Sequence, residues 1–590
     1  MLKSIRIGAE SFHKLIESNS YYVDKTSFIK TVFQDNTSDV MLITRPRRFG
    51  KTLTMSTFYD FLSLNPDNPG DVTCQEKWFK DTYIFEKEKA FCDEYMGKFP
   101  VIFISLKQVD GDDFISAYGR LVSVVHEMYT QFRYLATSNK LSPDEIEEYK
   151  LYLNKVYLRD PHNNDAVKDS LTTLLKFLNK HHGIRPILLI DEYDVPIAKA
   201  ASKNYYKEMI DIISPFLGSA LKTNTYLGRA VLTGCLRAAK ESIFTGLNNL
   251  LVCSVLDTGN NDISQGIGFT KEETQKVLNY YGLADYYDEV KKNYDGYYFG
   301  SVHMYCPWDV MSFCYSNYRK VGNDNELIVA DNYWINTSGN DVIGEFMGFI
   351  EPKDVEDMQN LLDGKSISTE VRKALCYGDL KKHDITDFWT LLLYTGYLTF
   401  DPMSYSLETK KYSLYIPNEE IRDCFKSKIL DFYKNNSFIK GYTNELVKGL
   451  FEGEAETVER NLNDLLKKYV SIRDFSVNAP KENYYHGFIN GLLVNGTSLI
   501  QEQKSNVESG DGYVDIIVAS RDSDTVAILE LKQTEKPFGA RLIAAQKAVE
   551  QIIEKDYASV YISDPLVRNV YAYGICFHIK SCSVVVKKLK

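Results

Sequence analysis

Two groups of residues in this sequence have the types and the spacing that chemistry on phosphates requires. The first is Arg45-Pro-Arg-Arg-Phe-Gly-Lys-Thr52, which follows the apolar run Val40–Thr44 and precedes the helix-forming stretch Leu53–Leu62. In a strand–loop–helix arrangement, the loop N–H groups and the helix N-terminus face a bound anion. The segment therefore predicts a phosphate-binding loop for ATP.

Each part of this loop has an expected role. Lys51 would meet the β and γ phosphates, and the Thr52 hydroxyl would bind Mg²⁺. The loop residues expected to contact the nucleotide are Arg48, Phe49, Gly50, Lys51 and Thr52. Arg45 stands where the general G-x-x-x-x-G-K-[ST] pattern has its first glycine, so the motif taken alone also fits a basic strand-to-helix turn.

An acidic pair downstream strengthens the nucleotide interpretation. The apolar run Ile187–Ile190 ends in Asp191 and Glu192. Asp191 can hold the Mg²⁺ shell, and Glu192 can polarise the attacking water. Strands often end in acids for structural reasons, but such a run downstream of Gly-Lys-Thr is much less common by chance. Together, the two motifs predict binding and hydrolysis of ATP.

Two neighbouring runs add to the nucleotide site. Ala230–Thr233 ends in a hydroxyl, that of Thr233, which could sense the γ-phosphate. Arg237 follows on the adjoining turn, where either an ATP contact or a surface salt bridge would explain it. The run Val101–Leu106 lies between the two motifs and fits the subclass of phosphate-loop ATPases that inserts one strand there.

The second chemical group is Asp515, Glu530 and Lys532 near the C-terminus. Side chains along a strand alternate faces, so Glu530 and Lys532 share one face while Leu529 and Leu531 pack the other. A hairpin over residues 520–524 would bring Asp515 near that face. Two metal-binding carboxylates and a lysine are the apparatus of a Mg²⁺-dependent phosphodiester nuclease, and the alternative is an exposed hairpin with an incidental ion pair.

Three more polar residues flank this second group. Glu482 could add a third metal-binding carboxylate, and Gln551, on the expected helix Leu542–Lys555, could brace the acids. For both residues a purely structural role remains an equal alternative. His486 fits a helix-packing histidine better than a metal ligand.

The elements that position these residues suggest three regions. Residues 1–270 alternate apolar runs with helical stretches, as in a parallel sheet with crossover helices, and residues 271–430 are rich in helix formers and aromatics. Residues 431–590 contain β-branched runs again. These C-terminal runs are Val514–Ala519, Thr525–Lys532, Ser559–Ile562 and Val570–Ile579.

Composition narrows the class of protein. The 590 residues are 44% hydrophobic and 25% charged, which is ordinary for a soluble protein, and the net charge of −11 argues against a histone-like binder. The N-terminus lacks the apolar core of a signal peptide, and no run of 18 apolar residues exists, so we expect a cytoplasmic protein without membrane contact. The ten cysteines form no C-x-x-C pair and are expected to be buried thiols.

Several of these motifs together resemble the bacterial AAA-ATPase-like family whose members carry a C-terminal PD-(D/E)XK nuclease domain. The stretches that carry the resemblance are Tyr21–Thr26, Arg45–Thr52, Ile190–Asp194, Thr245–Asn249, Tyr294–Gly300, Pro307–Trp308, Tyr394–Leu398, Tyr485–Phe488 and Glu530–Lys532. Arg45 in place of the loop glycine belongs to that family's pattern. The resemblance implies an ASCE-type phosphate-loop sheet, a helical middle region and a restriction-endonuclease-like C-terminal α/β domain. It also implies Lys51, Thr52, Asp191 and Glu192 in one site and Asp515, Glu530 and Lys532 in the other.

The expected function is thus an ATPase whose nucleotide state controls a Mg²⁺-dependent nuclease that acts on nucleic acid, with DNA favoured. The architecture suggests a role in mobile-element or phage conflict, and a homo-oligomer is left open. The main alternative is a nucleotide-gated switch or scaffold whose C-terminal domain binds nucleic acid or protein without cleaving. The negative net charge favours that alternative, whereas the Asp-Glu-Lys group favours the nuclease.

Overall fold

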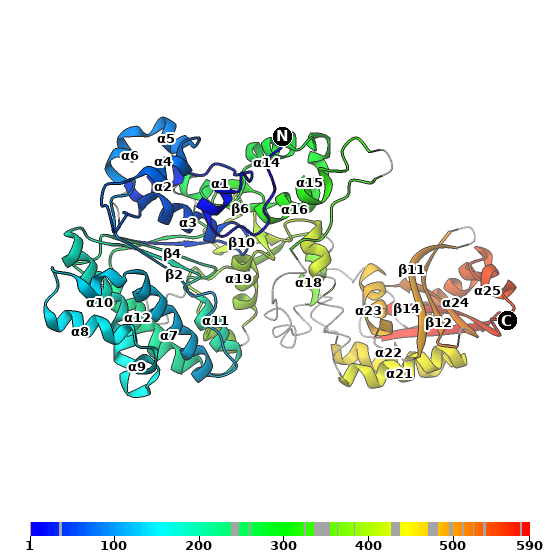
Figure 1. The fold of residues 1–590 in the computed structure, drawn as a ribbon. Coiled ribbons are helices and arrows are strands. Elements are labelled where there is room, and N and C mark those ends of the chain that lie inside the picture. The colour runs from blue at the N-terminus through cyan, green and yellow to red at the C-terminus, as the bar shows by residue number, and fades with distance from the viewer. Residues whose placement is uncertain are drawn as a thin grey trace. The chain divides into compact units, whose positions relative to one another are not determined.

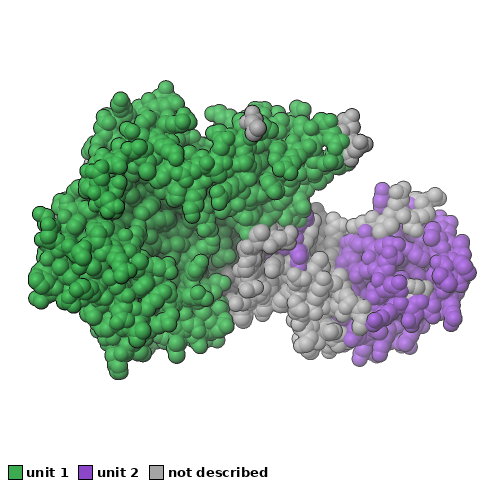
Figure 2. All heavy atoms as spheres, viewed as in Figure 1, with its two compact units in different colours: residues 1–338, 366–422 green, residues 339–365, 423–590 purple. Residues whose placement is uncertain are grey.

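The chain folds into two units in the computed structural model (Figure 2). Unit 1 comprises residues 1–338 and 366–422, and unit 2 comprises residues 339–365 and 423–590. The structure describes residues 2–590 except 35–37, 238–246, 258, 260, 324–325, 335–354, 363, 383, 426, 428–436, 470–481, 495–498, 510–511, 523, 535–537 and 579–580.

A parallel sheet forms the centre of unit 1. Its described strands run in the order β2-β3-β4-β1-β5 and pair in parallel throughout. They are β1 (Val40–Thr44), β2 (Val101–Ser105), β3 (Ile187–Asp191), β4 (Arg229–Gly234) and β5 (Leu250–Cys253). β1, β3 and β4 are buried along their whole length, as expected for strands covered by helices on both faces. The expected α/β fold is confirmed.

Helices cover both faces of this sheet. In Figure 1, α1 and α3 lie on one side of it and α7, α10 and α12 on the other. The helices are α1 (Phe12–Glu17), α2 (Ser27–Gln34), α3 (Lys51–Leu62), α4 (Thr73–Phe79), α5 (Tyr83–Lys87), α6 (Lys89–Tyr95), α7 (Phe114–Gln131), α8 (Pro143–Tyr152), α9 (Lys155–Arg159), α10 (Asn164–His182), α11 (Val195–Ser202), α12 (Tyr206–Leu221) and α13 (Asn261–Gln265). Local sequence sets several of their starts: Ser142 and Glu145 form a capping box that begins α8 at Pro143.

The middle region contains helices, as expected, together with two small sheets. The helices are α14 (Lys271–Tyr280), α15 (Tyr287–Tyr294), α16 (Pro307–Asn317), α18 (Val355–Leu362) and α19 (Ile385–Thr395). β6 (Tyr297–Phe299) pairs with β7 (Val302–Met304), and β10 (Lys411–Tyr415) pairs with β8 (Ile367–Glu370) and β9 (Thr399–Phe400). Aromatic side chains such as Tyr281, Tyr294 and Tyr305 form a buried cluster here.

Unit 2 is built on a mixed sheet with the described order β11-β12-β13-β14-β15. The strands are β11 (Ile500–Ser509), β12 (Gly512–Ser520), β13 (Thr525–Gln533), β14 (Asn569–His578) and β15 (Ser581–Lys588), and β13 and β14 pair in parallel. The helices are α21 (Ser437–Glu452), α22 (Ala455–Tyr469), α23 (Glu482–Val494), α24 (Phe538–Glu554) and α25 (Ser559–Ser563). One apolar cluster packs the sheet against α21, α22 and α23, and a second packs it against α24.

One predicted strand is wrong. The run Ser559–Ile562 forms helix α25, in which Val560 and Ile562 are 67% and 39% exposed. β-branched residues favour strands mainly where they pack on a sheet, and both β-branched residues of this run stay exposed. The expected strand Val570–Ile579 corresponds to β14, although Ile579 lies outside the described residues.

Candidate functional site

The loop between β1 and α3 turns sharply into the helix. Gly50 is the N-cap residue of α3 and has a φ of 93°, in the left-handed region that glycine tolerates best. Arg48 also has a positive φ, 70°, which is uncommon for a residue with a side chain. Both conformations turn the chain between the strand and the helix N-terminus, where backbone N–H groups are available to an anion.

Lys51 is buried at this helix N-terminus. Its Nζ donates to the carbonyl oxygens of Arg45 and Pro46, each at 3.1 Å, and lies 3.5 Å from the Glu192 carboxylate. Burial lowers its pKa, but the neighbouring Cys235 thiol and the carboxylates of Glu192, Asp191 and Asp194 outweigh that effect and raise the pKa above its ordinary value. Lys51 is therefore a fixed cation beside the loop.

The predicted metal-side residues meet at Asp191. Thr52 Oγ1 donates to Asp191 Oδ2 at 2.8 Å, and Thr233 Oγ1 donates to Oδ1 at 2.7 Å. Asp191 is fully buried at the end of β3, and burial together with the charge of Glu192 raises its pKa. β3, β4 and the loop after β1 thus bring together a hydroxyl–carboxylate–hydroxyl group.

Glu192 lies beside this group with a φ of 54°. Left-handed backbone at a residue with a side chain costs about 1 kcal/mol or more and is frequent at functional sites. Its side chain remains 17% exposed, whereas Asp191 is fully buried. Glu192 is thus the more accessible of the two acids.

Arg45 points away from the loop into the core. Its guanidinium donates to the carbonyl oxygens of Thr44, Cys253 and Ile263 at 2.8, 2.9 and 3.3 Å. It also lies 4.7 Å from the centre of the Phe299 ring. Burial lowers the pKa of Arg45 to about 10. Arg45 therefore ties the end of β1 to β5 and to α13, which explains why this position carries no glycine.

We expect Arg45→Ala to lower the free energy of unfolding by at least about 2 kcal/mol, because it leaves buried carbonyls unsatisfied at about 1–3 kcal/mol each. Arg120→Ala is the matched control, since Arg120 is exposed on α7. It should change stability by less than about 0.5 kcal/mol. Urea denaturation of both variants measures this difference, and equal losses would contradict the anchoring role of Arg45.

The side chains of the other predicted loop residues contact the middle region. Arg48 donates to the Tyr333 carbonyl oxygen at 3.3 Å and lies 4.5 Å from the Trp308 ring centre. Phe49 is buried and packs 5.0 Å from Tyr297 and from Phe299. The backbones of Arg48 and Phe49 remain in the loop. Each residue could therefore offer a phosphate its main-chain N–H group rather than its side chain. Arg237 is partly buried just after β4.

In unit 2, the strands β12 and β13 bring the second group together. The Leu531 N–H donates to Asp515 Oδ2 at 2.7 Å. Glu530 Oε1 accepts from Lys532 Nζ at 2.8 Å and from Gln551 Nε2, on α24, at 2.5 Å. Glu530 is 3% exposed in spite of its charge. The predicted hairpin is confirmed, and Gln551 does brace one of the acids.

Two further residues named in the sequence analysis lie on α23. Glu482 begins the helix, but its side chain lies outside the described residues. His486 Nε2 lies 3.0 Å from the carbonyl oxygen of Asp515, so the ring contacts this group rather than only packing the helix.

Comparison with known proteins agrees with both expected domains. Residues 6–244 match the sequence model of the predicted AAA-ATPase family, and residues 480–587 match that of the PD-(D/E)XK nuclease superfamily. This chain joins an AAA-ATPase-like domain to a PD-(D/E)XK superfamily domain. It is also 22% identical, over 99% of its length and 98% of the relative's, to an "Uncharacterized protein in vnfD 5'region" of Azotobacter chroococcum mcd 1.

The AAA-ATPase-like domain has a buried carboxylate to which the sequence analysis assigns no role. Asp194 Oδ2 accepts from the N–H groups of Cys235 and Leu236 at 2.9 and 3.0 Å, and from the Tyr377 hydroxyl at 3.1 Å. It thereby holds the chain after β4 and a segment of the middle region beside Glu192. The sequence shows only that Asp194 follows Asp191 by three residues. The partners of Asp194 lie 41 to 183 residues away, so no local pattern reveals them.

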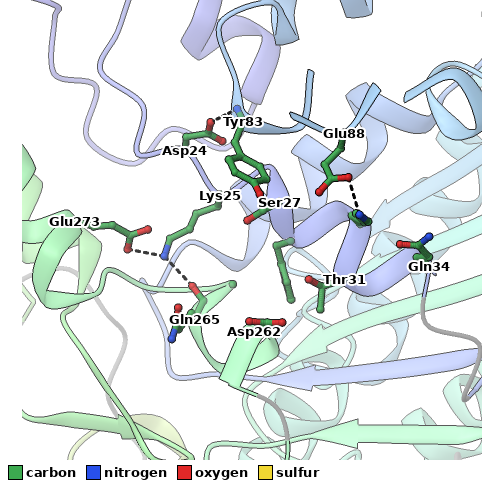
Figure 3. Close-up of a pocket in the computed structure, with 13 residues that line it drawn as sticks. Asp24, Lys25, Ser27, Thr31, Gln34, Tyr83, Glu88, Asp262, Gln265 and Glu273 are labelled. Atoms are coloured by element: carbon green, nitrogen blue, oxygen red, sulfur yellow. Dashed lines mark hydrogen bonds and ion pairs between the residues drawn. The ribbon is translucent and has the colours of Figure 1, made fainter. Parts of the chain in front are cut away.

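Unit 1 has a polar cavity of about 650 Å³ along α2 (Figure 3). Its charged side chains pair with one another: Lys25 lies 2.6 Å from Glu273, and Lys30 lies 2.6 Å from Glu88. Burial lowers the pKa of Lys25. None of the described residues that line this cavity belongs to the predicted nucleotide site.

The PD-(D/E)XK domain offers a donor set suited to Mg²⁺. Asp515 and Glu530 supply hard carboxylate oxygens, and Mg²⁺ usually keeps several waters and takes one or two protein carboxylates. Within the described part of the chain, no group of three or more His, Cys, Asp or Glu side chains is arranged to hold a metal ion. The donor set fits Mg²⁺ better than a structural zinc site, which needs four protein ligands.

Two further features concern membrane-crossing helices and the state of the cysteines. Among the described residues, no helix combines the length and the apolar character that crossing a membrane requires. All ten cysteines lie in the described part, and none of them is in a disulfide. Nine are buried as expected, whereas Cys74 is exposed.

Proposed function

We propose that this protein binds and hydrolyses ATP at the loop Arg45–Thr52, and that its nucleotide state controls a Mg²⁺-dependent nuclease in residues 431–590. The observation that carries the proposal is the same in both units. Each brings a lysine to the acid predicted to work beside it, Lys51 to Glu192 at 3.5 Å and Lys532 to Glu530 at 2.8 Å. Nucleic acid is the proposed substrate, with DNA favoured.

In the ATPase half, the role of each residue follows from its charge and position. Lys51 neutralises the β and γ phosphates, Glu192 takes the proton of the attacking water, and Thr233 senses the γ-phosphate. Arg237, on the turn after β4, contributes a further cation to the phosphates.

In the nuclease half, Lys532 orients or deprotonates the nucleophile while Gln551 holds Glu530 in place. Mg²⁺, held by Thr52 and Asp191 in one site and by Asp515, Glu530 and Glu482 in the other, would neutralise phosphate charge and lower the pKa of bound water. Protein carboxylates held by N–H groups need little rearrangement on metal binding, which favours this donor set.

We further propose that residues 271–430 couple the region 1–270 to the region 431–590. Support comes from contacts within unit 1, where Trp308 and Tyr333 contact Arg48 of the loop and Tyr377 contacts Asp194. The chain continues from these segments into unit 2 at residues 339 and 423. A nucleotide that rearranges the loop would therefore act directly on the segments that lead to the nuclease.

The cellular setting follows from the same proposal. Cysteines without disulfides and the lack of a membrane-crossing helix, both among the described residues, fit the cytoplasm of a bacterium. A role in mobile-element or phage conflict fits an ATP-controlled nuclease, and such a protein can act as a homo-oligomer.

A nuclease assay of the full chain tests the proposed function. Single- and double-stranded DNA and RNA are incubated with Mg²⁺, with and without ATP, and ATP hydrolysis is followed in parallel. We expect metal-dependent cleavage of at least one substrate together with ATP turnover. Binding without cleavage would instead support a nucleotide-gated scaffold, which the net charge of −11 favours.

A further inference from the structure

A polar network joins α23 and the edge strand β11 beside Asp515. His486 Nε2 lies 3.0 Å from the Asp515 carbonyl oxygen and 3.2 Å from Ser505 Oγ. Because a carbonyl oxygen can only accept, Nε2 carries the hydrogen and donates it to Asp515. The network therefore ends on the backbone of a residue that we place in the nuclease site.

Two amide side chains brace the His486 ring. Asn490 Nδ2 donates to Ser505 Oγ at 3.0 Å and lies 3.4 Å from His486 Nδ1, which is free to accept in this tautomer. Gln503 Nε2 donates to Asn490 Oδ1 at 2.8 Å. A ring held in this way has little freedom, so its bond to Asp515 has a defined direction.

On one side of Asp515, β12 pairs with β11, through Val507 with Val514 and Ser505 with Ile516. The pairing of β12 with β13 begins at Ile516 and Leu529, one residue beyond Asp515. The next available N–H group, that of Leu531, donates to the Asp515 carboxylate at 2.7 Å instead. Besides the pairing of its neighbours with β11, Asp515 is held at two points, through its side chain by Leu531 and through its main chain by His486.

We propose that His486 is a positioning residue, which fixes the backbone of Asp515 so that its carboxylate is oriented for a divalent cation. This inference rests on the proposed function, in which Asp515 binds Mg²⁺. Groups that hydrogen-bond to a metal ligand orient it, and their loss typically weakens metal binding about 10- to 100-fold. A histidine that merely packs α23 would have no such effect.

Calorimetric titration of the full chain with Mn²⁺, without nucleotide, tests this role. The binding that is present in the parent and absent in Asp515→Asn defines the nuclease site. We expect His486→Ala to weaken that binding about 10-fold. His486→Gln should recover most of it, because the glutamine amide can donate to the same carbonyl oxygen.

Asn463→Ala is the matched control for a purely structural loss. Asn463, on α22, also clamps a strand backbone: its Oδ1 accepts from the Cys582 N–H at 2.7 Å, and its Nδ2 donates to the Cys582 carbonyl at 3.3 Å. That contact is on β15, at the other edge of the sheet. Asn463→Ala should lower stability in urea and leave Mn²⁺ affinity unchanged.

The possible results distinguish a failure of the positioning role of His486 from a failure of the proposed nuclease. Parent-like Mn²⁺ affinity in His486→Ala, or an equal weakening in Asn463→Ala, would overturn the positioning role and leave the proposed nuclease intact. A parent without any Asp515-dependent binding would overturn the proposed nuclease, and the role of His486 with it.

Discussion

Glu192→Gln should bind ATP as the parent does and hydrolyse it more slowly by a factor on the order of 10² to 10⁴. That range is what a positioned general base contributes. Glutamine keeps the size of the side chain, but it cannot take a proton from water. The fixed cation Lys51, 3.5 Å away, remains to hold the phosphates. Steady-state hydrolysis and equilibrium nucleotide binding, measured on the same preparation, separate the two effects.

A glutamate in another ion pair of unit 1 provides the control. Glu88 lies 2.6 Å from Lys30, and the two side chains are 23% and 35% exposed. Glu88→Gln should hydrolyse ATP like the parent, because partly exposed pairs contribute only about 0–1 kcal/mol to stability. Parent-like hydrolysis by Glu192→Gln would show that another residue positions the water.

Asp515→Asn and Glu530→Gln should each remove nucleic-acid cleavage while leaving the ATPase rate unchanged. A metal ion contributes several kcal/mol of charge stabilisation in such reactions, so losing a ligand should slow cleavage by about 10³-fold or more. Both residues lie in unit 2, whereas Thr52, Asp191 and Glu192 lie in unit 1. Cleavage and ATP hydrolysis are followed in one Mg²⁺ buffer.

Asp524→Asn is a suitable companion variant, because Asp524 lies at the far end of the same hairpin. Among the described contacts, its Oδ1 accepts only from the hydroxyl groups of Ser520 and Thr525. It should cleave like the parent. Loss of ATPase activity in Asp515→Asn would mean that the two domains share a site or that the variant misfolds, and near-UV circular dichroism distinguishes these outcomes.

The sequence predicts the sheet of unit 1 well because its strands are covered on both faces. Val40–Thr44 is β1 without any shift, and the expected run Ile187–Ile190 differs from β3 by one residue. β11 could not be found in the same way. It is an edge strand whose segment Gln501–Ser505 is entirely polar, so neither an apolar run nor an alternation marks it.

The two candidate sites show a similar division between local and distant signals. Thr52 and Asp191 could be paired because each belongs to a motif with its own local pattern. The contact of Tyr377 with Asp194 could not, because it joins residues 183 positions apart across the middle region. The bond from His486 to Asp515 depends on a main-chain oxygen, which no residue pattern specifies.

The most direct test of the central claim compares cleavage rates of the full chain in ATP, in ADP and without nucleotide. A ligand shifts a conformational equilibrium only by its differential affinity for the two states. In the proposed coupling, the contacts of Arg48 with Trp308 and Tyr333 transmit the nucleotide state to the middle region. We expect Mg²⁺-dependent cleavage by the parent to change with nucleotide state, and Lys51→Ala to be indifferent to it. Equal parent rates in all three conditions would contradict control of the nuclease by the ATPase.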